Sequence, residues 1–157
     1  MSDPAQVIEL LTDVNGSFIH EEKLSAAASA IIPGHLVEET TAGTVQENST
    51  AAANAQRLFA LTDLTVGGTI DDVYAVASTV RYGAAHTGQK VFGLVAAAAA
   101  AIVIGDALES AGDGTLRKAL ADAATDTAQR DAIVAYATEA VDNSGGGTAV
   151  RIKARVA

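Results

Sequence analysis

The sequence contains no cysteine and no tryptophan. Without cysteine, disulfide bonds and thiolate chemistry are excluded, and a metal site would have to use oxygen or imidazole ligands. Only three Phe and three Tyr occur in 157 residues, so the aromatic platforms that bind sugars or nucleotide bases are scarce. Because these absences leave few ways to build a catalytic site, we expect no enzymatic activity and no cofactor.

Long hydrophobic runs are also missing. The longest uninterrupted apolar run covers residues 94–104, which falls well short of the roughly 20 residues that a membrane-spanning helix needs. The N-terminal stretch MSDPAQVIELL carries acidic residues where a secretion signal would carry basic ones. We therefore expect neither a membrane interaction nor a secretion signal.

Basic residues are few, and they are unevenly distributed. The chain has 10 Lys and Arg against 19 Asp and Glu, and the net charge of −9 belongs entirely to residues 1–72. This balance argues against nucleic acid as a partner. One basic feature is present near the C-terminus, where Arg151, Lys153 and Arg155 alternate and would form a stripe on one face of a strand. Such a stripe is either a solvated strand face or a docking contact with an acidic protein surface.

The distribution of glycine divides the chain into two parts. Thirteen of the 14 glycines lie at or beyond Gly34. We therefore predict an extended N-terminal arm over residues 1–32, with a short helix over 5–11, and a β-rich body over residues 33–157.

Short apolar stretches separated by turn signals recur through the body. They predict strands over residues 36–40, 44–47, 57–61, 73–82, 90–95 and 149–156. The last is the clearest, because apolar and charged residues alternate strictly from Val150 to Val156. The pattern predicts a mainly β fold, a small antiparallel barrel or sandwich with one or two short helices.

Three alanine-rich segments are harder to interpret, because alanine favours helices. Residues 94–104 are apolar on every face, which predicts a buried segment in the form of a helical turn or two, a strand, or both. Alternation favours a strand within residues 130–142, joined to the last strand by DNSGGG as a long hairpin. Residues 116–127 are the best candidate for a helix in the body.

Two Gly-Asp pairs fall in the stretch VIGDALESAGDGTLRKAL. The spacing fits neither an EF-hand, whose twelfth position would be Arg117, nor a phosphate-binding loop, which needs Gly-Lys-Ser/Thr. We predict turns instead, a tight hairpin at Asp113-Gly114 and a strand boundary at Gly105-Asp106. The candidate turn residues are Gly105, Asp106, Gly112, Asp113 and Gly114. Calcium binding by Asp106, Glu109 and Asp113 is the alternative, and otherwise we expect no metal site.

Several phrases of the body together resemble the capsid decoration (cement) proteins of tailed bacterial and archaeal viruses. They are PGHLVEETTAGTVQENST, LFALTD, IDDVYAVASTVRYGAAHTGQKVFGLVA, IGDALESAGDGTLRK and AIVAYATEAVDNSGGGTAVRIKARVA. The most specific part is the GD.L.S.GDG.L turn followed by the final R-I-K-x-R-V strand. The resemblance covers residues 33–157 and leaves the arm uncovered.

The resemblance implies a structural virion protein without enzymatic activity, made in the host cytoplasm. It would bind the major capsid protein on the outer surface of an assembled icosahedral capsid, as homotrimers at threefold positions, and stabilise contacts between capsomers. Arg151, Lys153 and Arg155 are the candidate docking residues. The alternative function is a β-rich ligand-binding or carbohydrate-binding module.

Overall fold

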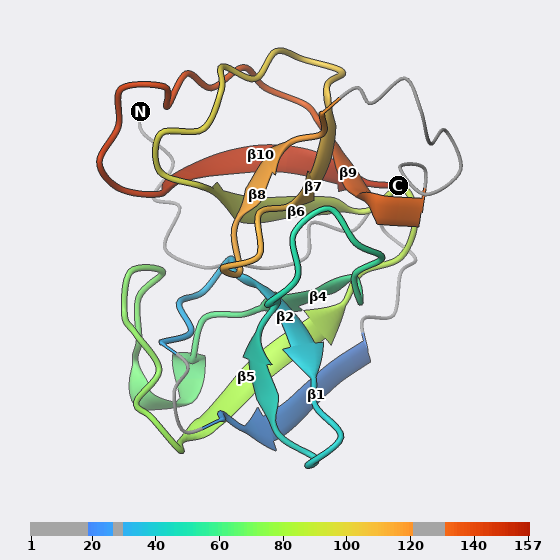
Figure 1. Cartoon of the computed structure of the whole chain (residues 1–157). Helices are drawn as coiled ribbons and strands as arrows, with labels where there is room; N and C mark the ends of the chain where they lie inside the picture. The colour runs from blue at the N-terminus through green and yellow to red at the C-terminus, as the bar shows by residue number, and fades with distance from the viewer. Residues whose placement is uncertain (1–18, 27–29, 121–130) are drawn as a thin grey trace.

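The computed structural model describes residues 19–26, 30–120 and 131–157. They form a closed barrel and a second, five-stranded sheet beneath it (Figure 1). The strands are β1 (Ile19–Leu24), β2 (Leu36–Glu39), β3 (Val45–Glu47), β4 (Leu58–Ala60), β5 (Thr79–Ala84), β6 (Lys90–Val95), β7 (Ala107–Ser110), β8 (Leu116–Lys118), β9 (Ile133–Ala137) and β10 (Val150–Val156). The predicted mainly β class is confirmed.

The barrel and the sheet are built from different parts of the chain. The sheet has the order β1-β5-β4-β2-β3, and the barrel closes in the order β10-β6-β8-β7-β9. Neighbouring strands are antiparallel except for β6 and β8, which run parallel. A 3-10 turn, η1 (Leu64–Val66), lies in the long connection between β4 and β5. Within the described residues, no helix has the length and apolar character needed to cross a bilayer.

Alternating burial explains why most of the predicted strands form. In β10, Ile152, Ala154 and Val156 are buried, while the residues between them face outward. Strands β2, β3, β4 and β6 lie within their predicted ranges, and β9 lies within residues 130–142 and pairs with β10 as expected. The strand predicted over 73–82 is wrong in its first half. Residues 73–78 are not a strand, and Ala77 has a left-handed φ of 58°, which extended backbone does not allow.

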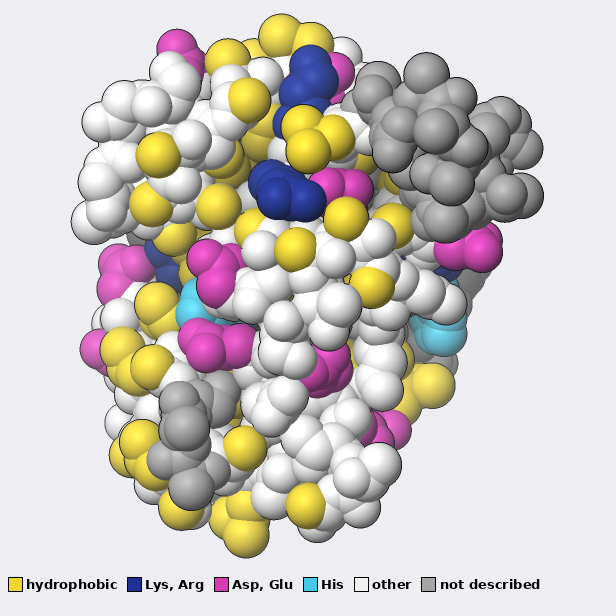
Figure 2. All heavy atoms as spheres, in the orientation of Figure 1, with side chains coloured by type: hydrophobic (Ala, Val, Ile, Leu, Met, Phe, Trp, Pro, Cys, Tyr) yellow, Lys and Arg dark blue, Asp and Glu magenta, His cyan; other side chains and the backbone are white. Residues whose placement is uncertain are grey.

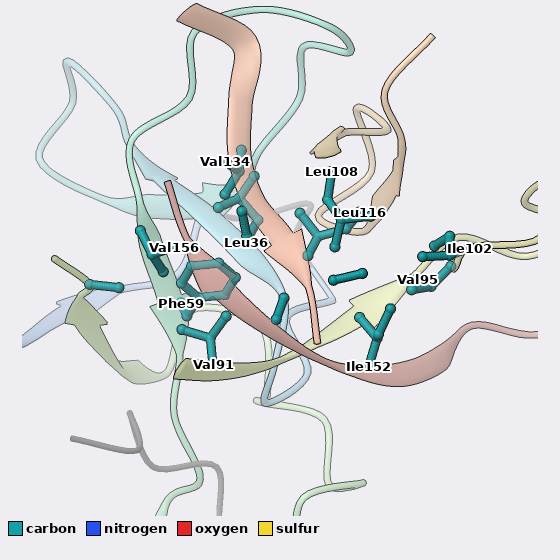
Figure 3. Close-up of a cluster of buried hydrophobic side chains, with 14 of the residues drawn as sticks. Leu36, Phe59, Val91, Val95, Ile102, Leu108, Leu116, Val134, Ile152 and Val156 are labelled. Carbon is teal, nitrogen blue, oxygen red and sulfur yellow. The ribbon is translucent and has the colours of Figure 1, made fainter. Parts of the chain in front are cut away.

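Strands β2 and β4 are shared by two hydrophobic cores. Leu36 and Phe59 project into the barrel core, which Figure 3 shows together with side chains of the barrel strands. The next residue in each strand, Val37 and Ala60, projects into a second core with Tyr74, Val80 and Tyr82. Because successive strand residues face opposite sides, a strand between two cores must be apolar on both faces. This is why Leu36-Val37 and LFAL are continuous apolar stretches rather than alternating ones.

The alanine-rich segment at 94–104 differs from the prediction of a buried helix or strand. Beyond the end of β6 it is a loop with large exposed side chains, Val103 at 56% and Ile104 at 70% exposure. Ala98 has a left-handed φ of 52°, which interrupts any regular element. Ile102 holds the loop in place, because it inserts into the barrel core and forms a bridge with Val141. Backbone hydrogen bonds from Ala96 to Leu116 and from Ala98 to Gly146, both 2.9 Å, also hold the loop.

The helix predicted over residues 116–127 is wrong for its first turn. Residues 116–118 form β8, which pairs with β7 on one side and β6 on the other. Pairing with two neighbours outweighs the local helix preference. Residues 121–130 lie outside the described residues, as does the helix predicted over 5–11.

Part of the predicted N-terminal arm belongs to the sheet. Residues 19–24 form β1, which pairs with β5 along its whole length, from Ile19 opposite Ala84 to Leu24 opposite Thr79. Ser25 then forms a bridge with Val45 of β3 at the far edge of the sheet. Ala26 also donates a backbone hydrogen bond to the Val45 carbonyl at 2.8 Å. These contacts curl the sheet around the second core.

Candidate functional site

The predicted docking stripe lies on the outward face of β10, but its three members differ in their surroundings. Lys153 and Arg155 are exposed. Arg151 is only 16% exposed and points toward the sheet, where it forms a 2.8 Å ion pair with Asp71. Its guanidinium also donates to the carbonyl oxygens of Pro33 and Ile70. Arg151 therefore helps to join the barrel to the sheet, and two of the three predicted residues project into solvent.

The strand register places three further residues next to Lys153 and Arg155. On β6, Lys90 lies directly opposite Arg155, and Phe92 lies opposite Lys153. On β9, Tyr136 lies opposite Arg155. Directly opposed residues of antiparallel strands share one face of the sheet. We call this surface the basic face, and it consists of Lys90, Phe92, Tyr136, Lys153 and Arg155.

The first Gly-Asp pair forms a turn immediately before β7. Gly105 has a φ of 92°, a conformation that favours glycine. Asp106 accepts a hydrogen bond from the Val103 backbone N–H at 2.8 Å and forms a 2.8 Å ion pair with Lys118. The Lys118 ammonium, followed by the Val103 N–H, holds the pKa of the Asp106 carboxyl below its usual value.

The second Gly-Asp pair forms the hairpin between β7 and β8. Gly112 and Gly114 have φ values of 89° and 76°, and the Asp113 carboxylate accepts hydrogen bonds from the Thr115 backbone N–H and hydroxyl. The hairpin tip lies against the sheet, because Gly114 accepts a 2.7 Å bond from the Leu36 N–H and donates one to the Asn48 carbonyl. This hairpin therefore attaches the barrel to the sheet.

Charged groups from both halves meet beside this hairpin. His35 is 5% exposed, and its Nδ1 lies 3.2 Å from a Glu47 carboxylate oxygen. Burial lowers the pKa of His35 to about 4; Asp113 opposes the shift, and Arg151 adds to it. Burial, followed by the charge of Asp113, raises the pKa of Glu47. In Figure 2, Asp and Glu side chains gather around the junction, whereas the prominent Lys and Arg side chains lie over the barrel.

The acids of the calcium alternative are engaged in other contacts. Asp106 pairs with Lys118, Glu109 pairs with Arg117 at 2.9 Å, and Asp113 closes the hairpin. Across residues 19–26, 30–120 and 131–157, no three His, Asp or Glu side chains are grouped so that they could hold a metal ion. The structure thus assigns each of the three carboxylates a role in holding strands and turns.

A cleft of about 610 Å³ lies between η1 with its flanking residues and the segment 72–79. Val66 and Val73 line it and are 78% and 57% exposed, and Leu64 and Val76 nearby are also exposed. Tyr74, the aromatic residue of the lining, is buried and donates its hydroxyl to the Leu61 carbonyl at 2.7 Å. The rest of the lining is mixed, because it combines aliphatic side chains with two Asp, two Thr and one Ser.

Comparison with known proteins finds a similar structure but no similar sequence. No model of a known protein family matches the chain, and a search of curated proteins finds no relative. Among solved structures, the N base of the head fiber gp8.5 of bacteriophage phi29 matches with a TM-score of 0.51. The chain is similar in fold to a phage head fiber base. The match covers 88% of this chain and 95% of the other at 12% identity, so it concerns the fold alone.

Sequence reasoning missed Lys90, Phe92 and Tyr136 of the basic face and the cleft beside η1. Lys90, Phe92 and Tyr136 lie in strands that were predicted. Their position beside Arg155 and Lys153, however, follows only from the register of β6 and β9 against β10. The cleft lies in TVGGTIDDVYAVAS, which reads locally as a turn followed by a strand. No local sequence signal indicates the cleft, because the exposure of the valines at 66, 73 and 76 is visible only in the fold.

Proposed function

We propose that this chain is a structural protein of a virus particle that binds the outside of an assembled icosahedral capsid and contributes binding surface rather than catalysis. The observation that carries the proposal is the fold likeness to a phage head fiber base, which extends over nearly the whole of both chains. The independent resemblance of residues 33–157 to capsid decoration proteins supports the same class. The partner would be the major capsid protein.

We further propose that the chain acts as a homotrimer at threefold positions and stabilises contacts between capsomers. The composition of the core supports an oligomer. Many of its buried residues are alanines, among them Ala60, Ala135, Ala137 and Ala154. Each buries little apolar area, so a lone protomer gains less from its core than a chain of larger residues would. Contacts among copies, and with the capsid, would add the missing burial.

The direct test is addition of the purified chain to heads of its virus that were assembled without it. We expect the chain to co-sediment with the heads and to saturate at a fixed ratio to the major capsid protein, equal to one trimer per threefold position. Heads that already carry the chain serve as the control and should take up no more. A chain that stays in the supernatant at saturating concentration contradicts the proposal.

The cleft favours a second candidate, a ligand-binding or carbohydrate-binding module. Its volume suits a small ligand, but its aromatic residue, Tyr74, is buried and does not present a ring face to the cleft. Binding of the isolated chain to a glycan array, abolished by Val73→Arg in the cleft wall, would favour the module over the virion protein.

A further inference from the structure

The basic face contains a pair of like charges that no carboxylate of the described residues neutralises. Lys90 and Arg155 are exposed and lie directly opposite each other on β6 and β10. Like charges at directly opposed positions destabilise a sheet. Among the described residues, neither side chain has a carboxylate partner. The repulsion between them would be relieved by negative charge supplied from outside the chain.

Five cations outside the basic face have carboxylate partners within the described residues, and Arg57 has none there. Ion pairs join Lys23 to Glu39, Arg81 to Glu22, Arg117 to Glu109, Lys118 to Asp106 and Arg151 to Asp71. Lys153 of the basic face has only a 3.9 Å contact with Glu139, and its side chain is 58% exposed. Glu139 also accepts a 2.7 Å hydrogen bond from the Lys153 backbone N–H, so within the described part of the chain it is the carboxylate of this face, and it pairs with neither Lys90 nor Arg155.

Aromatic side chains complete the surface. Tyr136 is 44% exposed beside Arg155, although Tyr74 and Tyr82 are buried. Phe92 is half-buried beside Lys153. Tyr and Arg, together with Trp, are enriched among the residues that carry the binding energy of protein interfaces, and here Arg155 lies between Tyr136 and Lys90.

We propose that the basic face docks the chain on a carboxylate-rich protein surface of the capsid exterior. Carboxylates of that surface would bind between Lys90 and Arg155, and Tyr136 and Phe92 would pack against its apolar parts. This inference rests on the proposed function. Charge complementarity favours a protein over nucleic acid, because three cations on a molecule of charge −9 are too few to attract a polyanion.

The test compares two double variants of equal net charge. Lys90→Gln with Arg155→Gln removes the opposed pair, and Arg81→Gln with Lys118→Gln removes two cations that have internal partners. Binding to heads lacking the chain is measured by co-sedimentation at low and at physiological salt. At low salt we expect the first variant to lose about tenfold in affinity and the second to stay within about twofold of the wild type.

A measurement on the isolated chain accompanies the binding assay. Because Lys90→Gln with Arg155→Gln removes a repulsion, its melting temperature should equal or exceed that of the wild type. Weaker binding together with unimpaired stability indicates that the pair serves the contact and not the fold. A lower melting temperature contradicts the proposal.

The remaining outcomes distinguish a failure of the proposed docking face from a failure of the proposed function. If the wild type does not bind heads, the proposed function fails and this inference fails with it. Wild-type binding that the first variant retains overturns the basic face and leaves the function standing. If the first variant instead alters self-association in sedimentation velocity, or abolishes binding to DNA, while head binding persists, the face contacts a second copy or a nucleic acid and the proposal is wrong.

Discussion

At the scale of single residues, His35 is a buried ionisable group whose pKa lies well below its usual value. It lies at the junction with Glu47 from β3, Asp113 from the hairpin and Arg151 from β10. The Ile32 backbone N–H donates to its Nδ1 at 3.3 Å, which requires that nitrogen to be unprotonated. Burial and this hydrogen bond both favour the neutral imidazole.

The depressed pKa of His35 predicts a loss of stability in mild acid. The unfolded chain binds a proton near the ordinary pKa of 6.5, whereas the folded chain binds it only near 4. Stability should therefore fall as pH decreases from about 6.5 to about 4, by up to about 3 kcal/mol. The raised pKa of Glu47 acts in the opposite direction, since it weakens the fold as pH rises. Urea unfolding at a series of pH values measures the sum.

The variant His35→Gln removes the contribution of His35 to the pH dependence of stability and leaves that of Glu47. Its unfolding free energy should change less with pH across that window than that of the wild type. His86 lies exposed in the turn after β5, so His86→Gln is the matched control and should keep the wild-type pH dependence. Parallel curves for wild type and His35→Gln would show that the imidazole is not the cause.

At the scale of elements, the hairpin between β7 and β8 requires glycine at position 112. Gly112 combines a left-handed φ of 89° with a close approach to the connection between β3 and β4, because a Cβ there would lie 3.0 Å from the backbone N of Ala51. We expect Gly112→Ala to destabilise the fold by about 2 to 3 kcal/mol, part from backbone strain and part from the clash. Thermal and urea unfolding measure the loss.

Alanine substitutions at two other glycines distinguish the cost of backbone strain from the cost of the clash. Gly105→Ala places a methyl group at a φ of 92° in open space, so it should show the strain alone, about 1 kcal/mol. Gly147 has no left-handed φ, and a Cβ there would have no atom within 4 Å, so Gly147→Ala should leave the free energy of unfolding nearly unchanged. Equal losses at Gly112 and Gly105 would mean that the contact with Ala51 relaxes without cost.

Some elements of the fold could be predicted from local sequence patterns, and others could not because they depend on distant contacts. Alternation identified β10, and the Gly-Asp pairs identified the turns, because both signals act over neighbouring residues. The loop at 96–104 was missed because polyalanine fits helix, strand or loop equally, and only the distant contact of Ile102 with Val141 decides. Likewise, no local pattern places Asp71 against Arg151, eighty positions later, or Lys90 against Arg155.

At the scale of the whole molecule, the two cores share a common layer. Phe59 of β4 is fully buried in the barrel core, and the next residue, Ala60, is fully buried in the second core. The hairpin and Arg151 add polar links between the halves. A substitution on the face of β4 that lies in one core should therefore also disturb the other core. We expect the barrel and the sheet to unfold as one unit.

This expectation is tested by Phe59→Ala, which leaves a cavity in the barrel core and should cost about 3 to 5 kcal/mol. Hydrogen exchange should show a similar loss of protection in β10 of the barrel and in β5 of the sheet. Phe59→Leu, with a smaller cavity, gives the same comparison if the alanine variant does not fold. Val76→Ala, at a position 58% exposed, is the control and should leave both strands protected. A loss confined to β10 would mean that the halves unfold independently despite their shared strands.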